Sequence, residues 1–417
     1  MKGSGNIMAK MMLLVIDSFG IGAMDDCKDY VPTDCRAKTY QHIREKKGGE
    51  LHIPTMYSLG LGALVDGKSE PENVFGYSKL AHHGADTYLG HQEIAGSCPK
   101  KSNKRLIKDI HQQMRQALEI SGYEVRYPIK GSPILLVNEA AVVADNLESA
   151  VGNIINVTAD FKKMPFKEVK KLGEAVRKNT DTTRVIAFGG PHTSIEKILS
   201  RVEEKKHNQW GINTPKAGVY GKDYEVYHMG YGVEVEKQFP MIAAKYGLPV
   251  YRLGKTADVL HGQGIAEPIV NTTKLLKRVA EAYHKERNDA AFLINVQETD
   301  LAGHSEDVDW YGALLNEVDN WLTDFIPTMG EDDLLIITAD HGNDPTIGHS
   351  NHTREYVPIM IVGKKVKKAN IGLRNSMSDI GATFCDFYGL PMTAEGTSFL
   401  DDIINRNDFT MSFKVVE

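Results

Sequence analysis

Short, nearly continuous apolar runs alternate along the chain with longer amphipathic stretches. The runs are six or seven residues long, which is typical of strands that are buried on both faces of a sheet. The amphipathic stretches repeat their apolar residues every three or four positions, as a helix packed against a sheet does. Strands alternating with helices predict an α/β fold with a mostly parallel sheet flanked by helices. The predicted strands are residues 11–16, 183–188, 248–253, 290–296, 333–338 and 357–362, and the predicted helices are residues 166–178, 271–286 and 306–325.

The middle of the chain is richer in charge than the rest. The segment KKSNKR opens this region at residue 100, and EEKKHNQ lies near its end. A chain of 417 residues is also too long for one typical domain. We therefore predict a core domain made of residues 11–99 and 228–417, interrupted by a smaller α/β cap domain at residues 100–227.

Composition and charge narrow the function classes. The chain is 41% hydrophobic and 25% charged, as expected for a globular protein. Its net charge of −6 argues against partners such as nucleic acid or a membrane surface, but does not argue against small anionic substrates. The apolar run MMLLVI is far shorter than the roughly 20 residues that span a membrane, and no signal-peptide pattern precedes it, so we expect a cytoplasmic protein.

The four cysteines do not form a recognisable metal or disulfide pattern. They are scattered, and no two form a C-x-x-C pair. We therefore expect neither a disulfide framework nor a zinc-thiolate site.

Residues with metal-binding side chains follow three of the predicted strands. In open α/β sheets, binding sites form at the carboxyl ends of the strands. Carboxylates and imidazoles gathered there would suit two divalent ions, with Mn or Mg favoured over Zn by the oxygen-rich ligand set. The candidate ligands are Asp17 after residues 11–16, Asp300 and His304 after residues 290–296, Asp340 and His341 after residues 333–338, and His352 in the following loop.

Each candidate ligand also has a structural interpretation. Asp17 is a possible helix N-cap, and a D-x-x-x-H spacing such as Asp300 to His304 often arises by chance. The adjacent Asp340 and His341 are compatible with a turn completed by Gly342. The metal-site hypothesis rests on their shared position after apolar strands.

The stretch GADTYLGHQEIAG, residues 84–96, contains a candidate nucleophile. A threonine hydroxyl becomes nucleophilic when a metal lowers its pKa or a base removes its proton. In a glycine-bounded loop beside two metals, Thr87 would meet that condition. The alternative is a loop threonine that caps a helix starting near His91. No dinucleotide fingerprint, P-loop or G-x-S-x-G elbow competes with this interpretation.

Four stretches of the chain resemble the phosphopentomutases, a family of the alkaline phosphatase superfamily. They are VIDSFGIGA, GADTYLGHQEIAG, LGKTADV and TADHGNDPTIGHSNHTREYVPIMIVG, and the similarity covers most of residues 11–97 and 240–400. The resemblance implies an alkaline-phosphatase-like core in which a threonine carries a phosphoryl group between two Mn ions. It implies that Thr87 is the phosphoryl acceptor and that Lys255 contacts the substrate phosphate. It also implies one metal held by Asp17, Asp340, His341 and Thr87, and another held by Asp300, His304 and His352.

The chain departs from the family pattern in three places. Three residues separate Asp300 from His304, where phosphopentomutases usually have four, and this spacing is closer to cofactor-independent phosphoglycerate mutases. A Ser-Ala-Asp stretch that reaches the sugar is replaced by LLVNEAAVVADN, with Glu139 near the expected place. The arginines of the family's cap that hold ribose phosphate are missing. We therefore interpret the chain as a divergent branch whose substrate is a phosphorylated small molecule, and the missing arginines argue against ribose phosphate itself.

These observations predict an isomerase that moves a phosphoryl group through phospho-Thr87, under a cap that excludes water. Two alternatives remain at this stage. One is a metal-dependent phosphatase or phosphodiesterase on the same core, which would release inorganic phosphate from sugar phosphates. The other is a non-catalytic protein that binds a metal or metabolite.

Overall fold

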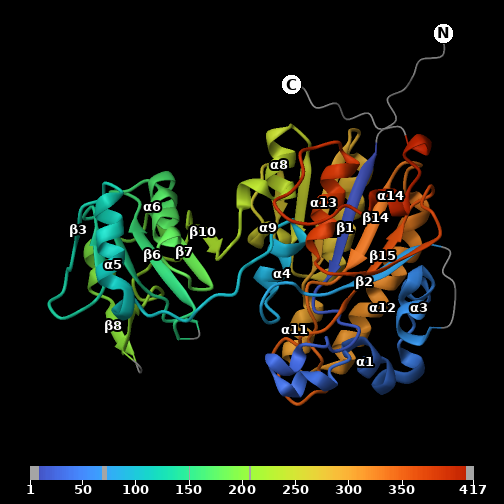
Figure 1. The fold of residues 1–417 in the computed structure, drawn as a ribbon, viewed down its shortest axis with the longest axis horizontal. Helices are drawn as coiled ribbons and strands as arrows, with labels where there is room; N and C mark the ends of the chain where they lie inside the picture. Colours follow the sequence, from blue (N-terminus) through green and yellow to red (C-terminus); the bar gives the residue numbers. More distant parts are fainter. Residues whose placement is uncertain (1–8, 68–72, 150, 206–207, 410–417) are drawn as a thin grey trace, which may run out of the picture. The chain divides into compact units, whose positions relative to one another are not determined.

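The computed structural model describes residues 9–67, 73–149, 151–205 and 208–409 (Figure 1). By its internal contacts the chain divides into two compact units. The first unit consists of Met1–Pro99 and Glu234–Glu417, and the second of Lys100–Val233. The boundary expected after Tyr227 falls inside strand β10 (Glu225–Gly230), which pairs with β7 of the second unit.

The first unit is built on an eight-stranded sheet in the order β12-β11-β13-β1-β14-β15-β2-β16. The first five strands in this order, from β12 to β14, run parallel to one another. Strand β15 runs antiparallel to both β14 and β2. The strands are β1 (Lys10–Ile16), β2 (Val74–Ser78), β11 (Val250–Gly254), β12 (Ile265–Glu267), β13 (Ala290–Val296), β14 (Leu334–Thr338), β15 (Val357–Val362) and β16 (Ala369–Arg374).

Every residue of β1, β13 and β14 is buried. Successive side chains of a strand point to opposite faces, so helices must cover both faces of the sheet. This explains why these strands appear in the sequence as continuous apolar runs, and the predicted α/β class is confirmed. The helices of the first unit are α1 (Thr39–Lys47), α2 (Pro54–Met56), α3 (Gly62–Asp66), α4 (Thr87–Ile94), α8 (Phe239–Lys245), α9 (Thr256–Val259), α10 (Thr272–Lys285), α11 (Glu298–His304), α12 (Val308–Phe325), α13 (Ser378–Phe387) and α14 (Leu400–Ile403).

The second unit has its own mixed sheet, in which β10, β7, β6, β5, β4 and β3 are neighbours in that order. Strand β9 pairs with β5 and β8, and separate apolar clusters lie on the two sides of the sheet. The elements are α5 (Ile107–Ile120), β3 (Val125–Arg126), β4 (Leu135–Val137), β5 (Ala141–Asp145), β6 (Ile154–Asp160), α6 (Phe166–Lys178), β7 (Arg184–Gly190), α7 (Ile195–Leu199), β8 (Val202–Lys205) and β9 (Gln209–Ile212).

The chain leaves the first unit after Pro99 and returns to it at Glu234, and hydrogen bonds join the segments on either side of this interval. The buried side chain of Gln238 donates to Gln92 Oε1 at 2.9 Å and to Ser97 Oγ at 3.0 Å. The Phe239 amide donates to the Ala95 carbonyl at 2.9 Å. The first unit therefore closes on itself across the 134-residue interval that forms the second.

One expectation about the cysteines is wrong. Cys27 and Cys35 form a disulfide, with their Cα atoms 5.5 Å apart. Two short 3-10 turns, Cys27–Asp29 and Pro32–Arg36, bring the two residues together, and the C-x-x-C criterion cannot detect such a pair. No helix among the described residues is long and apolar enough to cross a membrane.

The burial of β1 leads to a stability prediction. Met12→Ala should lower the free energy of unfolding by about 2–5 kcal/mol, because it leaves a cavity in the centre of the sheet. Met392 is 48% exposed, whereas Met12 is 0% exposed. Met392→Ala is therefore the matched control and should change stability by less than about 0.5 kcal/mol. Urea unfolding curves measure both, and equal losses in the two variants would contradict this account.

Candidate active site

The candidate site lies at the carboxyl ends of three neighbouring parallel strands. Asp17 follows β1 directly, and its amide donates to the Val296 carbonyl at the end of β13 at 3.2 Å. Asp340 lies two residues after β14, and Asp300 lies in the first turn of α11, which follows β13. Because β13, β1 and β14 are adjacent and parallel, these three carboxylates meet at one edge of the sheet.

Five of the predicted ligands form two groups that could each hold a metal ion. Asp17, Asp340 and His341 offer ligand atoms within 4.8 Å of one another, and so do Asp300, His341 and His352. His341 therefore belongs to both groups, although the motifs placed it in only one. Its imidazole stacks on that of His352, with the ring centroids 3.8 Å apart.

His304 lies at the edge of the second group. Its Nε2 atom is 3.0 Å from Nε2 of His352 and 3.5 Å from Oδ1 of Asp300. The side chain is 42% exposed, and its Nδ1 is 2.6 Å from the Ser350 carbonyl. His304 is thus close enough to approach an ion held by Asp300 and His352, but more accessible than either.

A buried polar atom shared by both groups indicates that a cation fits here. His341 Nε2 is buried and takes part in no hydrogen bond, whereas the buried Oδ2 of Asp17 has Lys255 Nζ as its ion-pair partner at 2.5 Å. Leaving a buried polar atom such as His341 Nε2 without a partner costs about 1–3 kcal/mol. A divalent ion would give this nitrogen a partner, and the mixture of carboxylate oxygens and imidazole nitrogens suits Mn, Mg or Zn.

The electrostatics of the site agree with this interpretation. Burial, together with the negative charge of Asp340, raises the pKa of Asp17 to about 8. Burial acts in the same direction on Asp340, but His341, His91 and Lys255 outweigh it and hold the pKa of Asp340 well below its usual range. The carboxylates therefore repel one another, and ionising all of them requires added positive charge.

Lys255 supplies part of that charge. It follows β11, and its Nζ lies 2.5 Å from Asp17 Oδ2 and 3.2 Å from Asp300 Oδ2. Burial acts to lower the pKa of Lys255, but Asp17, Asp300 and Asp340 together raise it, so the ammonium stays charged. Lys255 thus links the two carboxylate groups.

Thr87 is the first residue of helix α4, not a loop residue. The helix is capped by Asp86, whose side chain accepts from the Leu89 amide at 2.9 Å, and it begins four residues before the expected start near His91. Asp is a preferred N-cap, and that preference in the sequence could have located the helix start. The Thr87 hydroxyl donates to Asp340 Oδ2 at 2.5 Å and accepts from Lys255 Nζ at 3.2 Å.

His91 is a site residue that the sequence analysis missed. It lies one helical turn after Thr87 and is fully buried. Its Nδ1 is 2.8 Å from the Thr87 carbonyl and 3.3 Å from Asp340 Oδ2, and its Nε2 is 3.1 Å from Asn295 Nδ2. The spacing of four between Thr87 and His91 on one helix face was the available signal.

Arg354 fixes the loop that leads into α4. Its buried guanidinium binds both carboxylate oxygens of Asp26, at 2.9 and 2.8 Å. It also donates to the carbonyls of Leu80, His82 and Gly84, at 2.8, 2.9 and 2.6 Å. The residue lies in the motif block that contains His352, so this block both supplies a candidate ligand and positions Thr87.

Glu355 supports the turn after His341. Its buried carboxylate accepts from the amides of Gly22 and Thr39 at 3.0 Å each, and from the hydroxyls of Thr39 and Thr353 at 2.5 and 2.7 Å. A Cβ atom on Gly342 would lie 2.4 Å from Glu355 Oε1, so only glycine fits there. Gly342 therefore serves the close approach of this carboxylate.

Glu139 belongs to the second unit, in the turn between β4 and β5, where both of its carboxylate oxygens accept from the Arg126 guanidinium. It has a φ of 52°, an exposed side chain and no other described partner. Its contacts are those of a surface ion pair.

Comparison with known proteins identifies the class. The sequence model of the Metalloenzyme superfamily matches residues 9–392, so the chain belongs to that superfamily, which implies binding of divalent metal. Among curated relatives, the phosphopentomutase of Alkaliphilus oremlandii is 31% identical over 415 residues, covering 95% of this chain and 100% of the relative. The phosphopentomutase of Clostridioides difficile is 28% identical over 411 residues, with the same coverage.

At this similarity the chain is a member of the phosphopentomutase family. The resemblance given by the motifs is confirmed, and so is the enzyme class, an intramolecular phosphotransferase among the isomerases. Among solved structures, the Leishmania mexicana phosphoglycerate mutase has a TM-score of 0.49 at 14% identity, with 97% of this chain and 99% of that one covered. The alkaline phosphatase of the Antarctic bacterium TAB5 has a TM-score of 0.34 at 11% identity, with 93% and 99% covered.

The ligand groups lead to a metal-binding prediction. Asp340→Asn should lower the content of divalent metal in the purified protein, because it removes a charge from the group around Thr87. Metal analysis after dialysis against Mn²⁺ measures this. Asp344→Asn is the matched control, since Asp344 is buried nearby in the same motif but bonds Lys38, His42 and Thr346 instead. Unchanged metal content in Asp340→Asn would remove that residue from the ligand set.

Glu355 leads to a pH prediction. Burial raises its pKa from 4.5 to about 7, so the folded state binds its proton more tightly than the unfolded state does. Its contribution to stability is therefore full below about pH 4.5 and is lost as the pH rises through 7. The loss is on the order of 3 kcal/mol.

Glu355→Gln removes this titration. The amide can donate to the two threonine hydroxyls while its oxygen accepts from the two backbone amides. The melting temperature of the variant minus that of the native protein should therefore rise between pH 5 and 7, as thermal unfolding curves would show. A difference that stays constant with pH would contradict a titrating Glu355.

Proposed function

We propose that this chain is a sugar-phosphate mutase that transfers a phosphoryl group between two oxygens of a pentose phosphate through Thr87. The observation that carries the proposal is the Thr87 hydroxyl, held at the start of α4 by Asp340 Oδ2 at 2.5 Å and Lys255 Nζ at 3.2 Å. The relatives' name, phosphopentomutase, supports the pentose phosphate as substrate.

The position of Thr87 suits a phosphorylated side chain. The start of a helix exposes backbone amides and the positive end of the helix dipole, and both favour a phosphate group. Lys255 adds a full positive charge on the same oxygen. Asp340 is kept ionised by its histidine and lysine neighbours. It accepts a hydrogen bond from the Thr87 hydroxyl and so fixes the direction of that hydroxyl group.

The reaction we propose begins with phosphorylated Thr87. A hydroxyl of the sugar phosphate attacks the phosphorus, the bond from phosphorus to Oγ1 breaks, and the proton of the attacking hydroxyl ends on Oγ1. The resulting sugar bisphosphate then reorients in the site, so that its other phosphate faces Thr87. Oγ1 then attacks the other phosphorus, the bond from that phosphorus to the sugar oxygen breaks, and the proton returns to the sugar. The enzyme ends phosphorylated, and the sugar is isomerised.

Two divalent ions, with Mn favoured and Mg or Zn possible, complete the site in this proposal. Asp17, Asp340, His341 and Thr87 would hold one, and Asp300, His352 and His304 the other, with His341 between them. When bound, they would neutralise phosphoryl charge and lower the pKa of the hydroxyl. The residues of the chain hold and orient the reacting groups: Lys255 the phosphate, Asp340 the hydroxyl, and Arg354 the loop that precedes α4.

The experiment that tests the function is conversion of ribose 1-phosphate to ribose 5-phosphate. Thr87→Ala should reduce kcat by at least about three orders of magnitude, because no other side chain replaces the acceptor oxygen. Thr87→Ser is the matched control: it keeps the oxygen and should retain measurable turnover. Mass spectrometry after incubation with a ribose bisphosphate should locate phosphate on Thr87.

Two outcomes would contradict the proposal. Release of inorganic phosphate at the rate of substrate loss would indicate a phosphatase instead. Phosphate found only on another residue, with Thr87→Ala still active, would remove Thr87 from the mechanism.

A further inference from the structure

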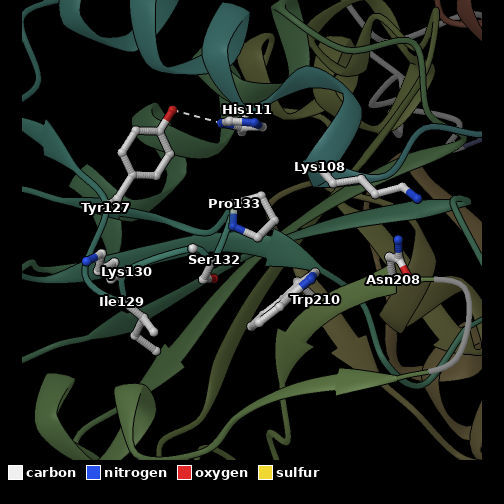
Figure 2. Close-up of a pocket in the computed structure, with 10 residues that line it drawn as sticks. Lys108, His111, Tyr127, Ile129, Lys130, Ser132, Pro133, Asn208 and Trp210 are labelled. Carbon is white, nitrogen blue, oxygen red and sulfur yellow. Dashed lines mark hydrogen bonds between the residues drawn. The ribbon is translucent and has the colours of Figure 1, made fainter.

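The second unit contains a cavity that the proposed reaction does not use. Its volume is about 470 Å³, within the range of small-molecule sites. It is formed by the first turns of α5, the loop from β3 to β4, and the start of β9 (Figure 2). Strand β5 ends beside it, because Asp145, the last residue of β5, bonds residues that flank the cavity.

Rings line much of this cavity. Figure 2 shows Trp210 and the pair His111 and Tyr127 on opposite sides of Pro133. His111 Nδ1 and the Tyr127 hydroxyl share a hydrogen bond of 2.8 Å, so these two rings hold each other in place. Flat aromatic and proline surfaces favour a planar ring as ligand, since stacking contributes about 1–3 kcal/mol per base in nucleic-acid complexes.

The charge of the cavity favours an anion. Lys108 and Lys130 line it, and among the described residues the lining contains no aspartate or glutamate, although the buried Asp145 behind it interacts with Lys108. Within the described residues, neither lysine has a carboxylate within ion-pair distance, whereas Lys163 and Lys171 of the same unit do. The unit as a whole has 22 Lys and Arg against 15 Asp and Glu, a net charge of +7, while the rest of the chain has 27 against 40, a net charge of −13.

The cavity is preformed on two sides. The buried carboxylate of Asp145 accepts from the amide of Ile107, which precedes Lys108, at 2.7 Å. It also accepts from the amide of Trp210 at 2.8 Å. One side chain therefore ties the wall that carries Lys108 and His111 to the wall that carries Trp210.

From the rings, the two lysines that form no ion pair within the described residues, and the lack of a carboxylate among the described lining residues, we infer that this cavity binds a nucleoside monophosphate. The base would stack on Trp210, and the phosphate would lie against Lys108, which Figure 2 places on the other side of His111 from Tyr127. The inference goes beyond the proposed mutase function and does not depend on it, since every lining residue belongs to the second unit.

The test is a titration of the full-length protein with adenosine monophosphate, with ribose 5-phosphate present throughout to fill the proposed catalytic site. Calorimetry measures the dissociation constant. Fluorescence reports the location, since Trp210 is the one tryptophan of the second unit. The expected result is binding with a fluorescence change that disappears in Trp210→Phe while the heat signal remains.

Lys108→Ala should raise the dissociation constant about tenfold or more, because it removes a charged contact with the phosphate. Lys167→Ala, an exposed lysine of α6 that does not line the cavity, should leave it unchanged. Adenosine and inorganic phosphate should each bind at least about tenfold more weakly than the nucleotide. Adenosine lacks the phosphate that would contact Lys108, and inorganic phosphate lacks the base that would stack on Trp210.

Four results would overturn the inference. They are no binding at about 1 mM nucleotide, equal affinity in Lys108→Ala and the native protein, equal affinity for adenosine or phosphate, and a fluorescence change that persists in Trp210→Phe. Circular dichroism of each variant establishes that any loss of nucleotide binding is not caused by misfolding.

Discussion

Mutual repulsion among Asp17, Asp300 and Asp340 is the constraint around which the first unit is organised. Three neighbouring parallel strands deliver these buried carboxylates to one edge of the sheet, where water cannot screen them. A repulsion of this kind needs fixed positive charge close by. Lys255, His91 and His352 provide part of it, and the buried His341 Nε2, which takes part in no hydrogen bond, is a position at which a cation would add more. The covered sheet keeps the carboxylates from moving apart.

The segment from His352 to Glu355 shows how much of the site depends on residues that are not ligands. His352 belongs to one of the two groups of candidate ligands. Arg354 fixes the carbonyls ahead of α4, and Glu355 fills the space beside Gly342. The two ligand groups and Thr87 are thus braced by one short stretch of chain. A substitution there would disturb geometry at several points at once, and this explains why the motif block extends beyond the ligands themselves.

Much of this arrangement could be predicted from the sequence, for a physical reason. Strands covered on both faces must be continuously apolar, so residues 11–16, 290–296 and 333–338 were visible as strands, and the candidate ligands follow each of them. The sharing of His341 between two groups depends on side-chain directions, which spacing does not determine. The Cys27–Cys35 pair depends on two consecutive tight turns, and the contact of Glu139 with Arg126 on a hairpin register. Thr87 was expected in a loop, but Asp86, a preferred N-cap residue, makes it the first residue of α4.

The closure of the first unit by Gln238 has a consequence for how such enzymes diversify. Because Gln92, Ser97 and Gln238 hold the two crossing points together, the sheet and the candidate site at its edge form a continuous body whatever chain lies between residues 99 and 234. Changes in the intervening 134 residues therefore leave the reactive groups where they are. Natural variation can remodel ligand preference in one module while the chemistry of the other is inherited intact. The departures from the family pattern that the motifs indicate within residues 100–233 are the kind of change that such an arrangement tolerates.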